Sequence, residues 1–481
     1  MMNSVRPATP YPSKLLIIVF VYVTLNMLAQ YLASPTADLD QAEQLLLAQY
    51  FQLGYSEQPP LYTWLVLSVF ALTGQSLAVL LAIKALLLTG VVATLLALGK
   101  RLGFGSQQLL IVVLSVVFIP QIIWESQRDL THSVLVTLMA AMTLLQVIRT
   151  QQLANLLNFA LLGVVVGLGL ITKYNFTIFL SAIILTVLCV GEYRRMIIKP
   201  GLLLSIAIAS AIALPHFLWA INHVDVVLGN VHKLKIEGGN PFQGLPKALL
   251  SALAYLSPLW LIALILLGKS AYYQKHVRDT DQRFLLCLLL MVLAVVMVFS
   301  MVTGTQKIKD RWYQPLLFFI PLWVAILAKP TPRRLNIYAG FAIFFALLVS
   351  FALTARTVLT DQFNHRSRPN MPYITAIKAI SAEIAVPDVI LADGKLLAGN
   401  ARAVFKQTYT LAPNYAIKPL STSGTALVLC ETEDCSRDNF KKWLMDKYNI
   451  DVNALTMNAR EYPFYYSEQH SKTFYWAVIS L

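Results

Sequence analysis

Residues 15–33 read LLIIVFVYVTLNMLAQYLA, and the acidic segment DLDQAEQ follows shortly after, at positions 38–44. An apolar run of this length is sufficient to cross a bilayer as a helix. It is longer than the apolar part of a signal peptide, so we expect an uncleaved span, although small residues at 33–37 leave cleavage open. Similar runs recur to about residue 353. The sequence therefore predicts a polytopic α-helical membrane protein with carboxylates close to the membrane surface, where such groups are costly and frequently functional.

The composition supports the same fold class. The 481 residues are 57% hydrophobic and only 13% charged, whereas soluble domains carry about 25% charged residues. The net charge of +14 does not indicate nucleic-acid binding. Its basic residues lie in short clusters between apolar runs, where they orient spans and meet anionic lipid.

These clusters separate the apolar runs in pairs, as expected when the chain returns to the cytoplasm after every second span. The N-terminus is then cytoplasmic, and an odd number of spans places residues beyond 356 on the outer side. Eleven spans fit the sequence, at about 15–34, 76–99, 107–124, 131–148, 154–172, 175–191, 201–220, 248–268, 284–302, 314–328 and 336–354.

Two hydrophilic regions on the outer side interrupt this pattern. In the loop 35–75, an amphipathic helix at 39–52 and an apolar one at 59–73 are predicted to lie in the membrane interface. The tail 356–481 alternates short β-rich runs with helical stretches and predicts a small α/β domain. Cys430 and Cys435 could form a disulfide there if the tail lies in an oxidising compartment.

The predicted outer loops hold most of the reactive side chains. If they converge over the bundle, carboxylates could act as bases while Lys and Arg bind a phosphate. The candidates are Asp38, Asp40, Glu43, Glu57, Glu125, Arg128, Asp129, Lys173, Tyr174, His223, His232, Lys233, Lys235, Lys307, Lys309, Asp310 and Arg311.

Several candidates also have a structural interpretation. Asp38 could cap the helix that follows, which we favour over chemistry at this position but not at Asp40. His216 fits a hydrogen-bonded residue at the end of a span, and Lys84 has no functional account beyond reaching the interface or an unseen partner. Arg128 and Asp129 could form a local ion pair, Lys173 could extend to the interface, and Arg311, Trp312 and Tyr313 could anchor the chain at the membrane surface.

Four segments, taken in order, resemble the bacterial polytopic glycosyltransferases of the protein-mannosyltransferase and aminoarabinose-transferase superfamily, which have the GT-C fold. The first combines DQAEQ at 40–44 with GYSEQPPLYTW at 54–64, where an aspartate precedes a Gly-Tyr and Pro-Pro motif. Asp129 looks like a second family acid opening a span. The segments GLITKY at 169–174 and RWYQP at 311–315 match later motifs.

Two positions depart from the family pattern. Gln41 stands in place of the usual glutamate, and Gln58 in place of the Lys or His before the proline pair. In aminoarabinose transferases that lysine helps to bind the lipid phosphate, so its replacement leaves the sugar and the acceptor open. The resemblance covers about residues 15–330.

The resemblance implies an inverting transferase in the bacterial inner membrane, formed by a transmembrane domain at 1–355 and a periplasmic domain at 356–481. It would move a sugar from a polyprenyl-phosphate carrier to a lipid A, core, glycan or protein acceptor. Asp40 would be the general base or would orient the acceptor, with Asp129 supporting it. Lys173 and Arg311 would neutralise the carrier phosphate. Tyr55 and Tyr174 would orient the sugar or the carrier, and Glu57, Gln58 and Tyr313 would also bind substrate.

Two other classes compete with this interpretation. A secondary transporter or lipid flippase would place ionisable groups near the midplane within repeated halves, whereas here they gather outside and no repeat is visible. A scaffold subunit would leave Asp40, Asp129 and Arg311 unexplained. No phosphate loop or dinucleotide motif is found, and no cofactor is expected. A divalent metal stays open, because Glu57 and His232 could approach one another.

Overall fold

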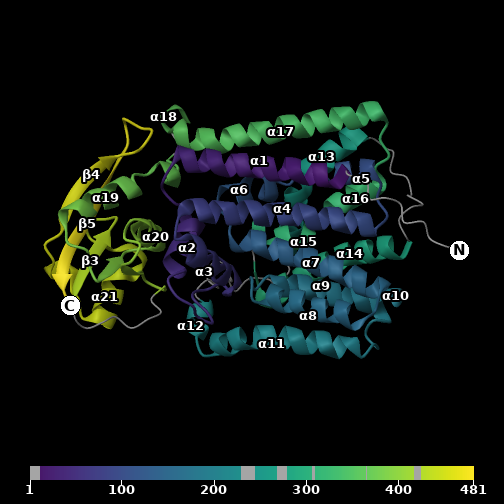
Figure 1. Ribbon diagram of the computed structural model, residues 1–481, viewed down its shortest axis with the longest axis horizontal. Helices are drawn as coiled ribbons and strands as arrows, with labels where there is room; N and C mark the ends of the chain where they lie inside the picture. The colour runs from purple at the N-terminus through teal and green to yellow at the C-terminus, as the bar shows by residue number, and fades with distance from the viewer. Residues whose placement is uncertain (1–10, 229–243, 268–278, 306–308, 364–365, 416–423) are drawn as a thin grey trace.

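A computed structural model describes residues 11–228, 244–267, 279–305, 309–363, 366–415 and 424–481. Long helices lie side by side in a bundle, and a sheet with its own helices covers one end of it (Figure 1). The C-terminal end of α1 lies at this covered end of the bundle. The Ser34 hydroxyl, directly after the helix, donates a hydrogen bond to the carbonyl of Pro369. The fold class predicted from the sequence, a polytopic helical bundle with a C-terminal α/β domain, is confirmed.

Over the described residues, seven helices are long and apolar enough to cross a membrane. The predicted spans all fall on these helices, on one bent pair, or on three shorter apolar segments. How many of the shorter segments cross the bilayer stays a prediction. The seven are α1 (Tyr11–Ala33), α4 (Leu77–Arg101), α7 (His132–Gln152), α11 (Gly201–Ile221), α13 (Gly244–Leu267), α14 (Asp279–Thr303) and α17 (Pro332–Val358), and the shorter segments are α8 (Leu156–Leu170), α9 (Phe176–Cys189) and α15 (Gln314–Leu317) with α16 (Ile320–Leu327).

The span predicted at 107–124 is bent rather than straight. Helix α5 (Ser106–Val116) and the segment Gln121–Arg128 meet at 69°. Pro120 stands at the break and lacks an N–H to continue the ladder, and a π-helical turn, η1 (Gln121–Glu125), follows it. After the short α6 (Ser126–Arg128), the bend brings Asp129 beneath the covered end of the bundle.

Two helices of the loop that connects α1 and α4 lie between the bundle and the sheet domain (Figure 1). They are α2 (Leu39–Leu47), shorter than the predicted 39–52, and α3 (Leu61–Thr73), which follows the proline pair. The sequence predicted that α2 lies in the membrane interface with an exposed polar face, and this prediction is wrong. All residues of α2 from Gln41 to Leu47 are buried, because α20 (Lys395–Val404) of the C-terminal domain packs on it.

The C-terminal domain contains a five-stranded mixed sheet with the order β2-β1-β3-β5-β4. Strand β1 is parallel to β2 and β3, while β5 is antiparallel to β3 and β4. The predicted β-rich runs are β1, β3 and β5. The elements are α19 (Tyr373–Glu383), β1 (Val389–Ala392), α20 (Lys395–Val404), β2 (Tyr409–Leu411), β3 (Thr425–Cys430), α21 (Phe440–Tyr448), β4 (Asn458–Pro463) and β5 (Ser471–Ser480).

Short elements complete the described chain, and a disulfide joins Cys430, the last residue of β3, to Cys435. Apolar side chains from the bundle, from α2 and from the domain's helices belong to one continuous core. The domain is therefore joined to the bundle by packing as well as by the chain. The short elements are α10 (Gly191–Arg194), α12 (Val224–Val227), η4 (Asp310–Trp312), α18 (Thr360–Phe363), η5 (Arg368–Asn370), η6 (Arg437–Asn439) and η7 (Val452–Ala454).

Candidate functional site

The first turn of α2 begins at Asp38, which is a structural residue. Its carboxylate accepts a hydrogen bond from the Leu39 N–H, and its own N–H donates to the side chain of Gln41, which closes a capping box. The same buried carboxylate pairs with Arg356 and with Arg368, each at 3.2 Å. The interpretation of Asp38 as a helix cap is confirmed.

Two residues later, Asp40 has a different environment. Its backbone N–H donates to Oδ1 of Asp129 at 2.9 Å. Its side chain is partly exposed, and within the described ranges its carboxylate accepts no hydrogen bond. Burial opposes ionisation, but the positive charges of Lys395, Lys173 and Arg311 outweigh it and lower the pKa of Asp40. The Asp40 carboxylate thus lies among cations without an ion-pair partner in the described part of the chain, and its lowered pKa favours the ionised form.

Glu43 lies one turn further along the same face of α2. Its carboxylate pairs at 2.9 Å with the ammonium of Lys395, the first residue of α20. That ammonium also lies 5.8 Å from the centre of the Tyr415 ring. Burial and the charge of Asp40 raise the pKa of Glu43, although Lys395 opposes them. Lys395 was not identified from the sequence, because no local pattern connects it to residues some 350 positions earlier.

Asp129 supports the first turn of α2 from below. It accepts the Asp40 N–H through its side chain, while its backbone carbonyl accepts a 2.7 Å hydrogen bond from Lys84. Burial and the negative charges of Asp40 and Asp38 raise the pKa of Asp129. Lys84 therefore has a partner and fixes the turn before α7. Arg128 pairs with Glu125 at 2.8 Å instead of with Asp129.

His132, the first residue of α7, is another residue near Asp40 to which the sequence analysis gave no role. The Gln44 amide nitrogen lies 3.2 Å from its Nε2, and the Thr172 carbonyl lies 3.4 Å from its Nδ1. An amide nitrogen only donates, so Nε2 accepts and the proton is on Nδ1. Thr63 in turn donates to the Gln44 side-chain oxygen. This chain of hydrogen bonds holds α2, α3 and α7 together behind Asp40.

Two cations face Asp40 from other loops. Lys173 follows α8 and donates to the Ser133 hydroxyl at 2.7 Å. Burial and the charge of Arg311 lower the pKa of Lys173 to about 8. Arg311 lies in η4, is exposed, and pairs with no carboxylate of the described chain. Either cation could therefore bind an anionic group beside Asp40.

The hydroxyl groups of the candidate tyrosines Tyr55, Tyr174 and Tyr313 are hydrogen-bonded within the protein. Tyr55 donates to the carbonyl of Tyr50 and accepts from the N–H of Gln52, so it closes its own loop. The hydroxyl of Tyr313 donates to the Ala248 carbonyl at 2.6 Å. Tyr174 is 3.2 Å from Nε2 of His216, whose Nδ1 is 2.8 Å from the Leu53 carbonyl, so this histidine is hydrogen-bonded as expected.

The two polar residues before the proline pair differ in their surroundings. The side-chain oxygen of Gln58 is buried and accepts no hydrogen bond from the described residues. The negative charge of Glu57 contributes to the raised pKa of Glu43, so the two carboxylates are near enough to interact. No group of three or more His, Cys, Asp or Glu residues in the described ranges could hold a metal ion. His232, the other residue considered for a metal, lies outside those ranges.

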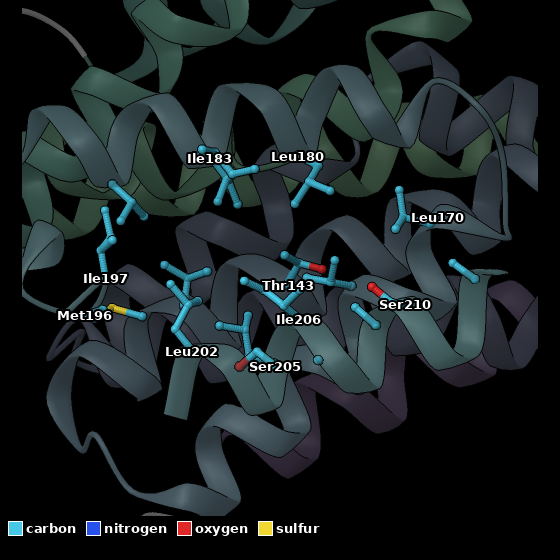
Figure 2. Close-up of a pocket in the computed structure, with 18 of the residues that line it drawn as sticks. Thr143, Leu170, Leu180, Ile183, Met196, Ile197, Leu202, Ser205, Ile206 and Ser210 are labelled. Atoms are coloured by element: carbon cyan, nitrogen blue, oxygen red, sulfur yellow. The ribbon is translucent and has the colours of Figure 1, made fainter. Parts of the chain in front are cut away.

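An apolar cavity of about 710 Å³ lies between α7, α8, α9 and α11 (Figure 2). It extends from Leu170, three residues before Lys173, to Met196 and Ile197 beyond α9. The hydroxyls of Thr143 and Ser205 on its wall donate to backbone carbonyls of the protein, so the lining offers little to a polar ligand. Such an apolar surface suits a hydrocarbon ligand.

Comparison with known proteins finds one family model and two glycosyltransferases to which the chain is similar. The family model for dolichyl-phosphate-mannose-protein mannosyltransferases matches residues 57–219. The lipopolysaccharide core galacturonosyltransferase RgtB of Rhizobium johnstonii is 29% identical over 462 residues, 92% of this chain and 93% of that protein. RgtA of the same organism, also a lipopolysaccharide core galacturonosyltransferase, is 26% identical over 407 residues, which cover 82% of this chain and 81% of that protein.

Two solved structures are similar in fold. ArnT from Cupriavidus metallidurans bound to undecaprenyl phosphate has a TM-score of 0.57 at 13% identity, covering 95% of this chain and 97% of that chain. The Archaeoglobus fulgidus oligosaccharyltransferase tethered to an acceptor peptide has a TM-score of 0.51 at 12% identity, covering 94% of this chain and 69% of that chain. At these identities the likeness shows the fold alone.

Proposed function

We propose that this chain is a membrane glycosyltransferase of the GT-C superfamily, which transfers one sugar from a polyprenyl-phosphate carrier to the lipopolysaccharide core. The observation that carries the proposal is the Asp40 carboxylate, which is unpaired among the described residues and faces Lys173 and Arg311. A base beside cations suits a reaction in which a hydroxyl loses a proton while a phosphate leaves.

The sugar that we propose is galacturonic acid. Similarity to two lipopolysaccharide core galacturonosyltransferases over most of the chain supports this choice. A uronic acid adds a carboxylate to the phosphate of the carrier, and the cations around Asp40 are suited to such an anionic donor. Gln58 in place of a basic residue is also consistent with a donor other than the cationic aminoarabinose.

The transfer would occur as one displacement with inversion. Asp40 takes the proton of the acceptor hydroxyl while that oxygen bonds to the anomeric carbon. The bond between this carbon and the phosphate oxygen breaks, and its electron pair leaves with the polyprenyl phosphate. Lys173 and Arg311 stabilise the negative charge that grows on the phosphate. Asp129 positions the first turn of α2 through its hydrogen bond to Asp40.

The apolar cavity of Figure 2 is our candidate for the site of the carrier's hydrocarbon chain. It begins close to Lys173, so the chain would lie among α7, α8, α9 and α11 with its phosphate at the site. The disulfide Cys430–Cys435 favours an oxidising compartment for the C-terminal domain. We therefore place the reaction at the periplasmic face of a bacterial inner membrane, with the N-terminus in the cytoplasm.

The test is transfer from a panel of radiolabelled polyprenyl-phosphate sugars to total envelope lipid, glycan and protein. We expect label from the galacturonosyl donor to enter the lipopolysaccharide fraction with the wild-type protein and not with Asp40→Asn. Transfer to another fraction or from another sugar would overturn the substrate assignment. Absence of transfer from any donor, with protein shown to be folded, would contradict the proposed carrier-dependent reaction and favour a transporter or flippase.

A further inference from the structure

The C-terminal domain is held firmly against α2. A Cβ on Gly399 of α20 would lie 2.0 Å from the carbonyl oxygen of Ala42, so only glycine permits this close approach of the two helices. Asn400 bonds to both the N–H and the carbonyl of Ala37 at the start of α2. At the other end, Gln49 bonds to the N–H and the carbonyl of Thr410. This docking fixes where Lys395 lies.

Lys395 meets two carboxylates that share one face of a helix. Asp40 and Glu43 are three residues apart on α2, a spacing that makes side chains neighbours. The Lys395 ammonium is 2.9 Å from Glu43, and of all charges it acts most strongly on Asp40. Without a cation there, two carboxylates one turn apart in a largely buried region would compete for ionisation.

We propose that Lys395 is a positioning residue for glycosyl transfer, supplying the countercharge for both carboxylates of α2 and thereby making the C-terminal domain part of the catalytic unit. The proposal rests on the function proposed above and adds to it a residue that acts through Asp40. The base and its countercharge would then come from opposite ends of the chain.

Other charged groups also face this pair, and they define what Lys395 adds. Lys173 and Arg311 are available to a leaving phosphate, whereas Lys395 is already engaged by Glu43. Its role is therefore distinct from theirs. The further groups acting on Asp40 or on Glu43 from packed elements are His132 of α7, Asp129 before α7, Lys84 of α4, Glu57 before α3, Tyr62 of α3 and Tyr415 after β2.

The first readout is the pH dependence of transfer by full-length protein in detergent. Removing the charge with Lys395→Met should raise the pKa of Asp40, so the acid limb of kcat/KM moves to higher pH by roughly 1–3 units. Lys395→Arg keeps the charge and should restore the wild-type limb. Lys378→Met, which removes an exposed charge of α19 in the same domain, serves as the matched control.

The second readout needs no substrate. A hydrophobic carbodiimide adds to protonated carboxyl groups, so peptide mass spectrometry across pH follows the protonation of Asp40. We expect Asp40 to be labelled at higher pH in Lys395→Met than in the wild type. If the wild-type protein transfers no sugar, the proposed function fails, whereas the labelling still decides the role of Lys395.

Two further variants test the proposal even if Lys395→Met does not fold or folds poorly. Glu43→Gln keeps the shape of the side chain and frees Lys395 for Asp40, so labelling and the acid limb should move to lower pH. Adding Glu43→Gln to Lys395→Met removes both charges and should bring the limb back toward the wild type. A purely structural role predicts that folded Lys395→Met keeps the wild-type profile, or that Lys395→Arg fails equally, and either result would overturn the proposal. If Lys395→Met does not fold, an unchanged profile in Glu43→Gln would overturn it.

Discussion

The first turn of α2 has two aspartates two residues apart, in two differently organised charged regions. The Asp38 carboxylate is fully engaged: it caps the helix and pairs with both Arg356 and Arg368. Around Asp40, Glu43 pairs with Lys395, but the Asp40 carboxylate itself forms no ion pair with the described residues and faces cations. The difference indicates that charged groups paired within the protein stabilise the fold, while charged groups without a protein partner are available to bind substrate.

The largest effect is expected from Asp40→Asn. The amide keeps the size of the side chain but cannot accept the acceptor's proton, so turnover should fall by about 10²–10⁴-fold. The melting temperature in detergent should stay unchanged, because no described partner bonds to the carboxylate. The measurement is initial-rate transfer at a matched concentration of folded protein. Near-normal turnover in the variant would make Asp40 a surface group.

Asp38→Asn should lower stability and leave the turnover of the folded protein unchanged, the reverse of Asp40→Asn. Asparagine is still a good N-cap, but the change leaves Arg356 without its charge partner. We expect a loss of at most about 3 kcal/mol in the free energy of unfolding, because Arg368 stays partly exposed. Thermal and urea unfolding measure this loss. A stable variant without activity would show that the two regions do not divide structure from chemistry in this way.

Arg311→Ala should chiefly weaken binding of the carrier. One charge-assisted hydrogen bond contributes about 1.5–3 kcal/mol, which corresponds to roughly a 10–100-fold loss of affinity. Binding of labelled undecaprenyl phosphate to purified protein is the measurement. Arg333→Ala, an exposed arginine in the first turn of α17, is the control. Unchanged carrier affinity in Arg311→Ala would remove this residue from the site.

Binding of the carrier should also weaken at alkaline pH. The pKa of Lys173 is lowered to about 8, so its ammonium is present below that pH and is lost above it. We expect affinity for the carrier to fall by roughly 10-fold as pH rises through about 8, the cost of losing one weak charged contact. Lys173→Arg stays charged and should flatten this dependence. An identical decline in both proteins would assign the titration to another group.

Tyr55→Phe should give the smallest effect. The hydroxyl closes a loop by bonding to Tyr50 and Gln52, so its loss should cost about 1 kcal/mol of stability. Turnover of the folded variant should match the wild type. A large fall in turnover without loss of stability would return Tyr55 to the substrate-binding residues.

Local patterns in the sequence predicted much of the bundle and part of the site. Apolar length located the helices, and Asp38 could be assigned to a cap because the signal lies within four residues. The bend at Pro120 was missed, since an apolar run does not reveal how its hydrogen-bond ladder breaks. Lys395 and the burial of α2 could not be predicted, because they depend on docking between segments some 350 residues apart.

The most direct measurement compares Asp40→Asn with Asp38→Asn in one preparation series, with the same donor and the same amount of folded protein. We predict that the Asp40 variant loses at least about 100-fold in turnover while keeping wild-type stability. The Asp38 variant should lose stability while its folded fraction keeps turning over. Equal loss of turnover in both, or normal turnover in Asp40→Asn, would contradict the assignment of Asp40 as the base.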